Sequence, residues 1–493
     1  MNTVDTTLEK ATKASFEGAA RAIKLVNDSN TVTVCWYRQV IGTMTATENG
    51  LVWNGYDTPE MEKFFGEFLP TRESDGMPQF LVNIMPENTV FEKLGIESQV
   101  DYLSSGLRFP SNTLVSGNSP FDLPFSNDYL TANLADHTDE QGVFTGSYQG
   151  KPPKSLEEDA LAEELSTIWK NRYVPRYSGA EMKIPVTLQE QGELQKAIST
   201  PFTHFLKLPN EGLKEGWGVN EWMCMQLCEA TGLPTAKHAL IEIDDRLPPA
   251  YITERFDIND ESKRGVTRRM MQDFCTLAGM RPLNDMHADS HKEGKSAGSL
   301  ESCAKTLRKF SSDPQGDVES LFKRALVSFT VGDEDMHRKN ISMIFRYDVQ
   351  TGQMIDGKMS PAYDITAEIH KRNENIAMTL PMGNKKNNIK LKTLMSCAKS
   401  MGIPEDRASE IIEDTMTKIA ARAVEIANNP PELAVKTDMC KFTVHRIASI
   451  AVARTKAMGF ETPEWENVDP VKMPATRSGQ EAAPINMAAF KLG

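Results

Sequence analysis

The sequence predicts a two-lobed α+β fold, in which a strand-rich N-terminal lobe precedes a helical C-terminal lobe. Short strand patterns recur up to about residue 256. Long amphipathic helices dominate after that point. The chain has 493 residues, a length typical of roughly two to three domains. We therefore expect a junction near residue 256, with a cleft between the two lobes.

The first lobe shows strands on both sides of one helix. Residues 31–53 alternate between apolar and polar side chains, and residues 203–209 form a short apolar run. The stretches "AKHALIEID" and "AYITERFDI" predict a hairpin joined by "DRLPP". Residues 220–234 predict a helix that ends near Gly232, because glycine favours the position just past the last helical turn.

The second lobe is predicted from helices at 317–330, 405–428 and 436–457, each with an apolar stripe at helical spacing. A polar and Pro-bearing stretch lies between residues 104 and 160, and the end of the chain is also polar. The expected organisation is an N-terminal subdomain (1–100), an irregular insertion or linker (101–175), the core of the first lobe (176–256), the helical lobe (257–458) and a C-terminal tail (459–493).

Composition excludes several classes of protein. The net charge of −13 argues against direct nucleic-acid binding, which usually needs a basic surplus. The seven cysteines form no CxxC pair, so neither a zinc knuckle nor a disulfide framework is indicated. No stretch reaches the roughly 20 apolar residues that span a bilayer. We expect a cytoplasmic protein without a membrane partner.

The stretch "GDEDMHRKN", residues 332–340, places many charges between two apolar segments. Asp335 and Asn340 stand five positions apart, and Asp364 follows in the charge-poor stretch "SPAYDIT". Phosphoryl transfer uses an aspartate to accept the hydroxyl proton, and an asparagine and a later aspartate to bind Mg²⁺, at this spacing. The alternatives are a solvated turn after a helix and, for Asp364, an ordinary turn residue.

Two features upstream fit the same chemistry. Lys207 lies within the strand 203–209, and Glu221 begins the next helix, which is how kinases place the lysine that holds ATP phosphates. The turn in "RYSGAEMK" can direct backbone N–H groups at a phosphate, although it has one glycine. Taken singly, these features are better explained as a snorkelling lysine, a first-turn glutamate and an ordinary hairpin. Their order along the chain favours the kinase interpretation.

The motifs resemble those of the HipA-like serine/threonine kinases, the toxins of bacterial type II toxin–antitoxin modules. "SGAEMK" is similar to that family's phosphate loop, "THFLKLP" to its lysine strand and "NEWMCMQLCEATGLP" to its Asn-Glu helix. "ITERFD", "MMQDFC", "GDEDMHRKNIS" and "MSPAYDIT" match further family motifs in the same order, and "FLVNIMPE" matches faintly. The resemblance implies a bilobal protein-kinase-like fold that uses ATP and Mg²⁺.

The resemblance also implies a role for each matching position. Asp335 is the catalytic base, with His337 beside it as a contact to the γ-phosphate or as a structural hydrogen-bond partner. Asn340 and Asp364 bind Mg²⁺. The implied ATP-binding residues are Ser178, Gly179, Ala180, Glu181 and Met182 in the phosphate loop, Lys207 and Glu221, Glu254 and Phe256 at the adenine hinge, and Lys339.

Family members are silenced by phosphorylation of serines in the phosphate loop. Ser178 keeps one such position, whereas Arg176 replaces the other, so autophosphorylation is expected at Ser178 alone. The implied partners are a helix-turn-helix antitoxin and a protein substrate such as a translation factor or an aminoacyl-tRNA synthetase. The implied outcome is growth arrest.

Three other functions fit parts of the sequence. A kinase of a lipid or small-molecule hydroxyl would need the same base and metal ligands. A catalytically silent module of kinase fold would lack some of them, and here all are present. A metal hydrolase built on Asp333, Asp335 and His337 would need a second cluster of comparable density. In the kinase interpretation, Asp333 and Glu334 are loop-entry or helix-end residues.

Overall fold

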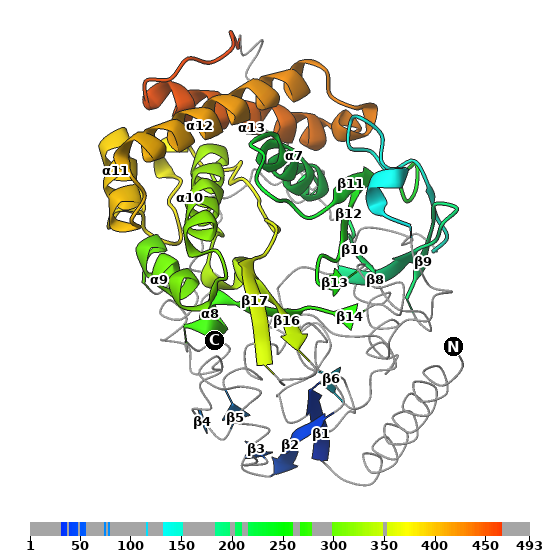
Figure 1. Cartoon of the computed structure of the whole chain (residues 1–493). Coiled ribbons are helices and arrows are strands. Elements are labelled where there is room, and N and C mark those ends of the chain that lie inside the picture. Colours follow the sequence, from blue (N-terminus) through cyan, green and yellow to red (C-terminus); the bar gives the residue numbers. More distant parts are fainter. Residues whose placement is uncertain are drawn as a thin grey trace, which may run out of the picture.

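The structure of the chain is a computed structural model. It describes residues 31–36, 39–47, 50–55, 73–74, 77–78, 115–116, 132–150, 183–197, 203–209, 215–259, 267–278, 298–348 and 353–465. In Figure 1, a curled sheet and a group of long helices lie on either side of helix α7 (Trp217–Ala230). This agrees with the predicted mixed fold of a strand-rich and a helical lobe.

The sheet of the first lobe has six strands in the order β11-β12-β10-β8-β9-β7. Neighbouring strands are antiparallel except β7 and β9, which are parallel. The expected hairpin is the pair β11 and β12. The strand bounds are β7 (Ser147–Tyr148), β8 (Lys183–Leu188), β9 (Glu193–Lys196), β10 (His204–Lys207), β11 (His238–Ile241) and β12 (Ala250–Glu254). Strand β7 comes from the stretch for which the sequence predicted an irregular insertion.

Strand β8 is buried along most of its length, because it lies inside the sheet and apolar side chains cover it. Helix α7 packs on β11 and β12 and also contacts α12 and α13, so it joins the two lobes. Gly232, just past the end of α7, has a φ of 76°, as expected of a glycine that terminates a helix. The fully buried apolar residues of the sheet include Ile184, Val186, Leu188, Leu206 and Ile252.

The second lobe contains the three predicted helices. They are α10 (Pro314–Val331), α12 (Glu405–Asn428) and α13 (Asp438–Ala457). The other helices there are α8 (Phe274–Leu277), α9 (Leu300–Phe310) and α11 (Leu391–Ser400), with short 3-10 turns η5 (Arg338–Asn340), η6 (Asn373–Asn375) and η7 (Glu432–Val435). None of the helices in the described ranges is both long and apolar enough to cross a bilayer.

The second lobe also has a sheet that the sequence interpretation missed. Strands β15 (Met270–Asp273), β16 (Ser342–Asp348) and β17 (Gln353–Met359) form it in that order. Strand β15 pairs with β16 across about seventy positions of chain, which local patterns do not reveal. Smaller two-stranded sheets pair β13 (Ile258–Asn259) with β14 (Thr267–Arg268), and β4 (Glu73–Ser74) with β5 (Met77–Pro78). A 3-10 turn, η3 (Leu134–His137), precedes strand β7.

The predicted strands at 31–53 form a separate sheet in the order β3-β2-β1-β6. Its members are β1 (Thr31–Trp36), β2 (Gln39–Thr47), β3 (Gly50–Gly55) and β6 (Val115–Ser116). The candidate site lies elsewhere, between the six-stranded sheet and the helical lobe.

Candidate active site

The centre of the site is a buried lysine between two carboxylates. Lys207 ends strand β10 and is only 8% exposed. Its Nζ donates to Glu221 Oε2 on α7 at 2.6 Å and to Asp364 Oδ1 at 2.5 Å. The Tyr251 ring of the neighbouring strand lies 5.8 Å from the ammonium, close enough for a cation–π contact. The carboxylates of Glu221 and Asp364 therefore both pair with the ammonium of Lys207, although Asp364 is far from Lys207 in the sequence.

Asp364 has an unusual backbone and a strongly perturbed carboxyl group. Its φ is 55°, in the left-handed region that non-glycine residues seldom adopt and that clusters at functional sites. Burial alone would raise its pKa, but Lys183 and then Lys207 hold the pKa well below the usual range of an aspartate. The carboxylate is therefore ionised throughout the neutral range, as a cation ligand must be.

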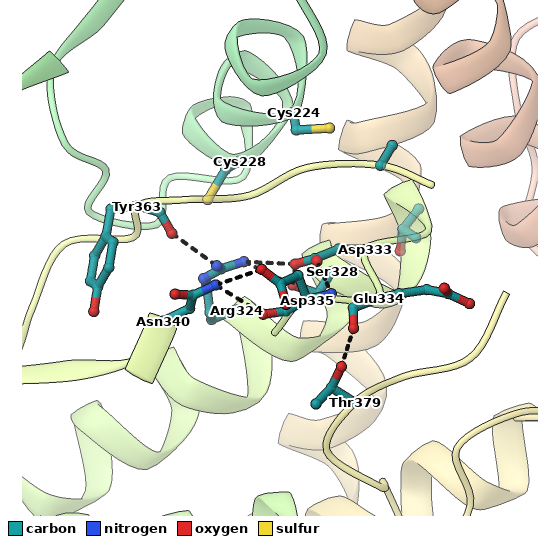
Figure 2. Close-up of polar contacts among 12 residues, drawn as sticks. Cys224, Cys228, Arg324, Ser328, Asp333, Glu334, Asp335, Asn340, Tyr363 and Thr379 are labelled. Atoms are coloured by element: carbon teal, nitrogen blue, oxygen red, sulfur yellow. Dashed lines mark hydrogen bonds and ion pairs between the residues drawn. The ribbon is translucent and has the colours of Figure 1, made fainter. Parts of the chain in front are cut away.

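The loop that carries Asp335 begins where α10 ends. Gly332 caps that helix with a φ of 82°, and the chain then turns sharply. The Asp335 side chain is 69% exposed. Asn340 Nδ2 donates to the Asp335 carbonyl at 2.9 Å and to its Oδ2 at 3.4 Å (Figure 2). His337 Nε2 lies 3.7 Å from Asp335 Oδ1. Its neighbours thus orient the Asp335 carboxylate and leave it accessible.

The Asp335 loop and the segment before Asp364 are joined directly. The Tyr363 hydroxyl donates to the Lys339 carbonyl at 2.9 Å and lies 2.6 Å from Ser342 Oγ. His337 also contributes to the lowered pKa of Asp364, so its imidazole lies within electrostatic reach of that carboxylate. These contacts link the exposed carboxylate of Asp335 and the amide of Asn340 to the segment that carries the partly buried carboxylate of Asp364.

The donor set at this location suits Mg²⁺, which prefers hard oxygen ligands and retains waters or phosphates in its shell. Asn340 uses Nδ2 for Asp335, so Oδ1 is the atom with which it can bind a cation. Asp364 Oδ2 lies 3.7 Å from Lys183 Nζ, beyond hydrogen-bond range, and can also coordinate. In the part of the chain that the structure describes, no three His, Cys, Asp or Glu side chains form a metal cluster by themselves.

The other predicted residues have mixed placements. Glu254 Oε2 accepts the Leu134 N–H at 2.9 Å, so this side chain makes a structural contact within the first lobe. Backbone groups near Glu254 are then the ones that could hydrogen-bond to adenine. The Phe256 ring lies 5.5 Å from that of Tyr363, beside the segment that carries Asp364. Burial raises the pKa of Asp273 and Lys339 partly opposes this, so the Lys339 charge lies near the start of α8. Ser178, Gly179, Ala180, Glu181 and Met182 lie outside the described residues.

Several residues at the site had no predicted role. Lys183 ends the phosphate-loop motif and reaches Asp364. Asn220 Nδ2 donates to the Ala367 carbonyl at 2.8 Å, and its Oδ1 accepts the Ala367 N–H at 2.7 Å. This double hydrogen bond fastens the segment after Asp364 to α7. The signal that could have found Asn220 is its position beside Glu221, on a helix whose other residues are mostly apolar.

The loop-entry residues also have more specific positions than the sequence indicated. Asp333 is fully buried and accepts the Asp335 N–H at 2.7 Å through Oδ1. Glu334 accepts the Ala377 N–H at 2.7 Å and hydrogen bonds from Lys371 and Thr379. Asp333 also pairs with Arg324 of α10, which stands in an otherwise apolar run; that position hints at burial but does not identify the partner.

Comparisons with known proteins agree with these motifs. The family model described as the HipA-like C-terminal domain matches residues 176–423, which is half of the chain. A curated relative, "Putative kinase Y4mE" of Sinorhizobium fredii, is 27% identical over 239 residues. That match includes 47% of this chain and 53% of the relative, so the chain spans about half the length of the relative.

The structural comparison supports the fold. HipA in the toxin–antitoxin complex with HipB and operator DNA from Shewanella oneidensis MR-1 is 17% identical, with a TM-score of 0.54. The match covers 87% of this chain and 98% of that chain. At this identity the similarity establishes a shared fold.

Proposed function

Because the chain belongs to the HipA-like kinase family, we propose that it transfers the γ-phosphate of ATP to a serine or threonine hydroxyl of a protein. One observation carries the proposal. The structure brings Lys207, Glu221 and Asp364 into one ion-paired group, and the segment of Asp364 contacts the loop that holds Asp335 and Asn340. These are the groups that phosphoryl transfer requires.

The proposed mechanism uses positioning and charge neutralisation, because the transferred phosphoryl group needs little covalent assistance. Asp335 accepts the proton of the attacking hydroxyl, which suits its exposed and oriented carboxylate. Lys207 binds the nucleotide phosphates, and Glu221 holds its ammonium in place. His337 stands next to Asp335, where it can contact the γ-phosphate.

Mg²⁺ held by Asn340 and Asp364 would neutralise the charge that develops on the phosphates. Asp364 accepts a hydrogen bond from Lys207, so the lysine ammonium lies in the region where the nucleotide phosphates would need positive charge. The turn from Ser178 to Met182 would cover the phosphates with backbone N–H groups, and the backbone after Glu254 would contact adenine beside Phe256. Lys339 would add positive charge from the far side of the loop.

The biological role belongs to the same proposal. We expect a cytoplasmic toxin that arrests growth by phosphorylating a translation-related protein, such as an aminoacyl-tRNA synthetase. A helix-turn-helix antitoxin would be its partner, since the structurally similar HipA is complexed with HipB. Phosphorylation of Ser178 would place a doubly charged group in the phosphate loop and compete with ATP.

The test is incubation of the purified chain with γ-labelled ATP, Mg²⁺ and bacterial extract. Asp335→Asn is a suitable variant, because the side chain is mostly exposed and the change keeps its shape. It should lower labelling by about 10²- to 10⁴-fold, the usual contribution of a general base. The control is Asp414→Asn, the same change in an exposed ion pair on α12.

Each outcome decides between functions. Label on serine or threonine of a protein band, lost in Asp335→Asn and kept in Asp414→Asn, supports the proposal. Label in a lipid or small-molecule fraction would instead indicate a different hydroxyl acceptor. Absence of any label from the wild-type chain would indicate a catalytically silent module.

A further inference from the structure

A buried ion pair lies beneath both loops of the site, and the proposed mechanism does not use it. Arg324 of α10 is 1% exposed and Asp333 is 0% exposed. Their Nη1 and Oδ2 atoms are 3.9 Å apart, with Ser328 Oγ between them. Nη1 donates to Ser328 Oγ at 2.8 Å, and that hydroxyl donates to Asp333 Oδ2 at 2.7 Å (Figure 2). Charges this deeply buried persist only when they are paired and hydrogen-bonded.

Each end of the ion pair reaches a different loop. Asp333 Oδ1 accepts the N–H of Asp335, the proposed base, at 2.7 Å. Arg324 Nη2 donates to the carbonyl of Tyr363 at 3.1 Å, and this carbonyl belongs to the peptide that joins Tyr363 to Asp364. Figure 2 shows the guanidinium between Tyr363 on one side and the Asp333–Asp335 turn on the other. A single side chain therefore contacts the immediate supports of both carboxylates.

We propose that Arg324 is a positioning residue that couples the Asp335 loop to the Asp364 segment. It acts on Asp335 through Asp333, which pairs with the guanidinium and accepts the Asp335 N–H. The inference deepens the proposed kinase function and rests on it. Arg324 is 1% exposed, so it acts on the site through the two loops that it contacts.

The chemistry of the guanidinium explains why an arginine occupies this position. Its planar fork presents Nη1 and Nη2 in fixed directions, so one group can serve two partners at once. A lysine is a single point charge that could keep the ion pair with Asp333 but not also reach Tyr363. The left-handed φ of 55° at Asp364 needs support from its surroundings, and the bond to the Tyr363 carbonyl supplies some of it.

The first test measures amide hydrogen exchange by mass spectrometry without nucleotide. Arg324→Met should accelerate exchange by about tenfold in peptides covering both 333–341 and 361–367, because both loops lose one support. Arg324→Lys should accelerate exchange in 361–367 alone. The control for general loss of stability is Val424→Ala, which lies in a separate small apolar cluster with Ala420 and Val452.

The second test separates kinetic parameters of phosphate transfer. Arg324→Met should lower kcat by about tenfold or more, since small displacements of reacting groups are costly. It should also raise the Mg²⁺ concentration for half-maximal rate, with Arg324→Lys intermediate and Val424→Ala like the wild type. If Arg324→Met does not fold, the hydrogen exchange of Arg324→Lys still tests the coupling, because acceleration confined to residues 361–367 is expected only if Arg324 supports that segment.

The coupling is overturned if exchange in the two loops does not exceed that of Val424→Ala, or if acceleration is confined to α10. It is also overturned if an active wild-type chain and Arg324→Met share the same kcat and Mg²⁺ dependence. A wild-type chain without any phosphate transfer would defeat the kinase proposal separately. The exchange result would still report whether the loops are linked.

Discussion

Replacing Lys207 by methionine tests the centre of the site through stability as well as activity. The lysine is 8% exposed and its partner Glu221 is 3% exposed, so Lys207→Met removes the ammonium of this pair while the Glu221 carboxylate stays buried. Breaking a buried pair in this way costs about 3–5 kcal/mol. Asp364 is less affected, because Lys183 lies near its other oxygen. A loss of this size is a large part of the roughly 5–15 kcal/mol that stabilises a typical domain.

A second variant isolates the cause. In Lys207→Met/Glu221→Gln the buried negative charge is removed as well, so the loss in free energy of unfolding should fall to about 1–3 kcal/mol, the usual cost of an unmade hydrogen bond. Phosphate transfer should be lost in both variants, since neither retains the ammonium. The matched control is Lys418→Met, which removes an exposed i,i+4 pair with Asp414 and should cost about 0.5 kcal/mol or less.

Urea unfolding followed by circular dichroism measures these differences. Two results would refute the reasoning about the buried pair. One is a loss below about 1 kcal/mol for Lys207→Met, the value expected of a surface pair. The other is a double variant no more stable than the single one.

Three further changes test the surroundings of Asp364. Asn220→Ala should reduce stability by about 1–3 kcal/mol and lower kcat in a labelled-ATP assay, because both polar groups of the Ala367 backbone lose their partner. Asp364→Asn should be less stable than the wild type at neutral pH: burial opposes ionisation, but Lys183 and Lys207 hold the pKa of Asp364 well below its usual range. That stability is present above the unfolded pKa of about 3.9 and is lost only as pH falls through the lower folded pKa, so the urea midpoints of the two chains should begin to approach each other below about pH 5 and should still differ at about pH 3. Arg454 of α13 is buried, and its Nε donates to Asn373 Oδ1 at 2.7 Å. Arg454→Met should release the segment around Asn373 and so lower both the unfolding midpoint in urea and the labelling rate. Unchanged labelling would contradict this expectation.

Local patterns predicted the elements that carry their own signals. The helices α10, α12 and α13 follow apolar stripes that the sequence displays, and Gly232 ends α7 as glycine at that position should. The order of motifs predicted the family, because spacing such as that between Asp335 and Asn340 is a property of the chain itself. Geometry that depends on a single loop can therefore be predicted from the sequence.

Geometry that depends on distant chain segments cannot be predicted in the same way. Strand β15 finds β16 from a long way along the sequence, and a six-stranded sheet recruits β7 from a stretch that looks irregular. In the sequence, Arg324 and Asp333 look like ordinary charged residues near the end of a helix. The fold buries both side chains, and they form an ion pair with each other. Burial decides the meaning of a charged residue, and a single sequence does not contain it.

The segment that follows Asp364 shows what these distant contacts achieve together. Asn220 binds its backbone at Ala367 from α7, and Glu334 binds it at Ala377 from the Asp335 loop. Arg446 and Arg454 of α13 donate to its carbonyls at residues 369, 371, 373 and 376. The side chains of α13, which lies beyond the residues matched by the family model, therefore fix the position of this segment through its backbone.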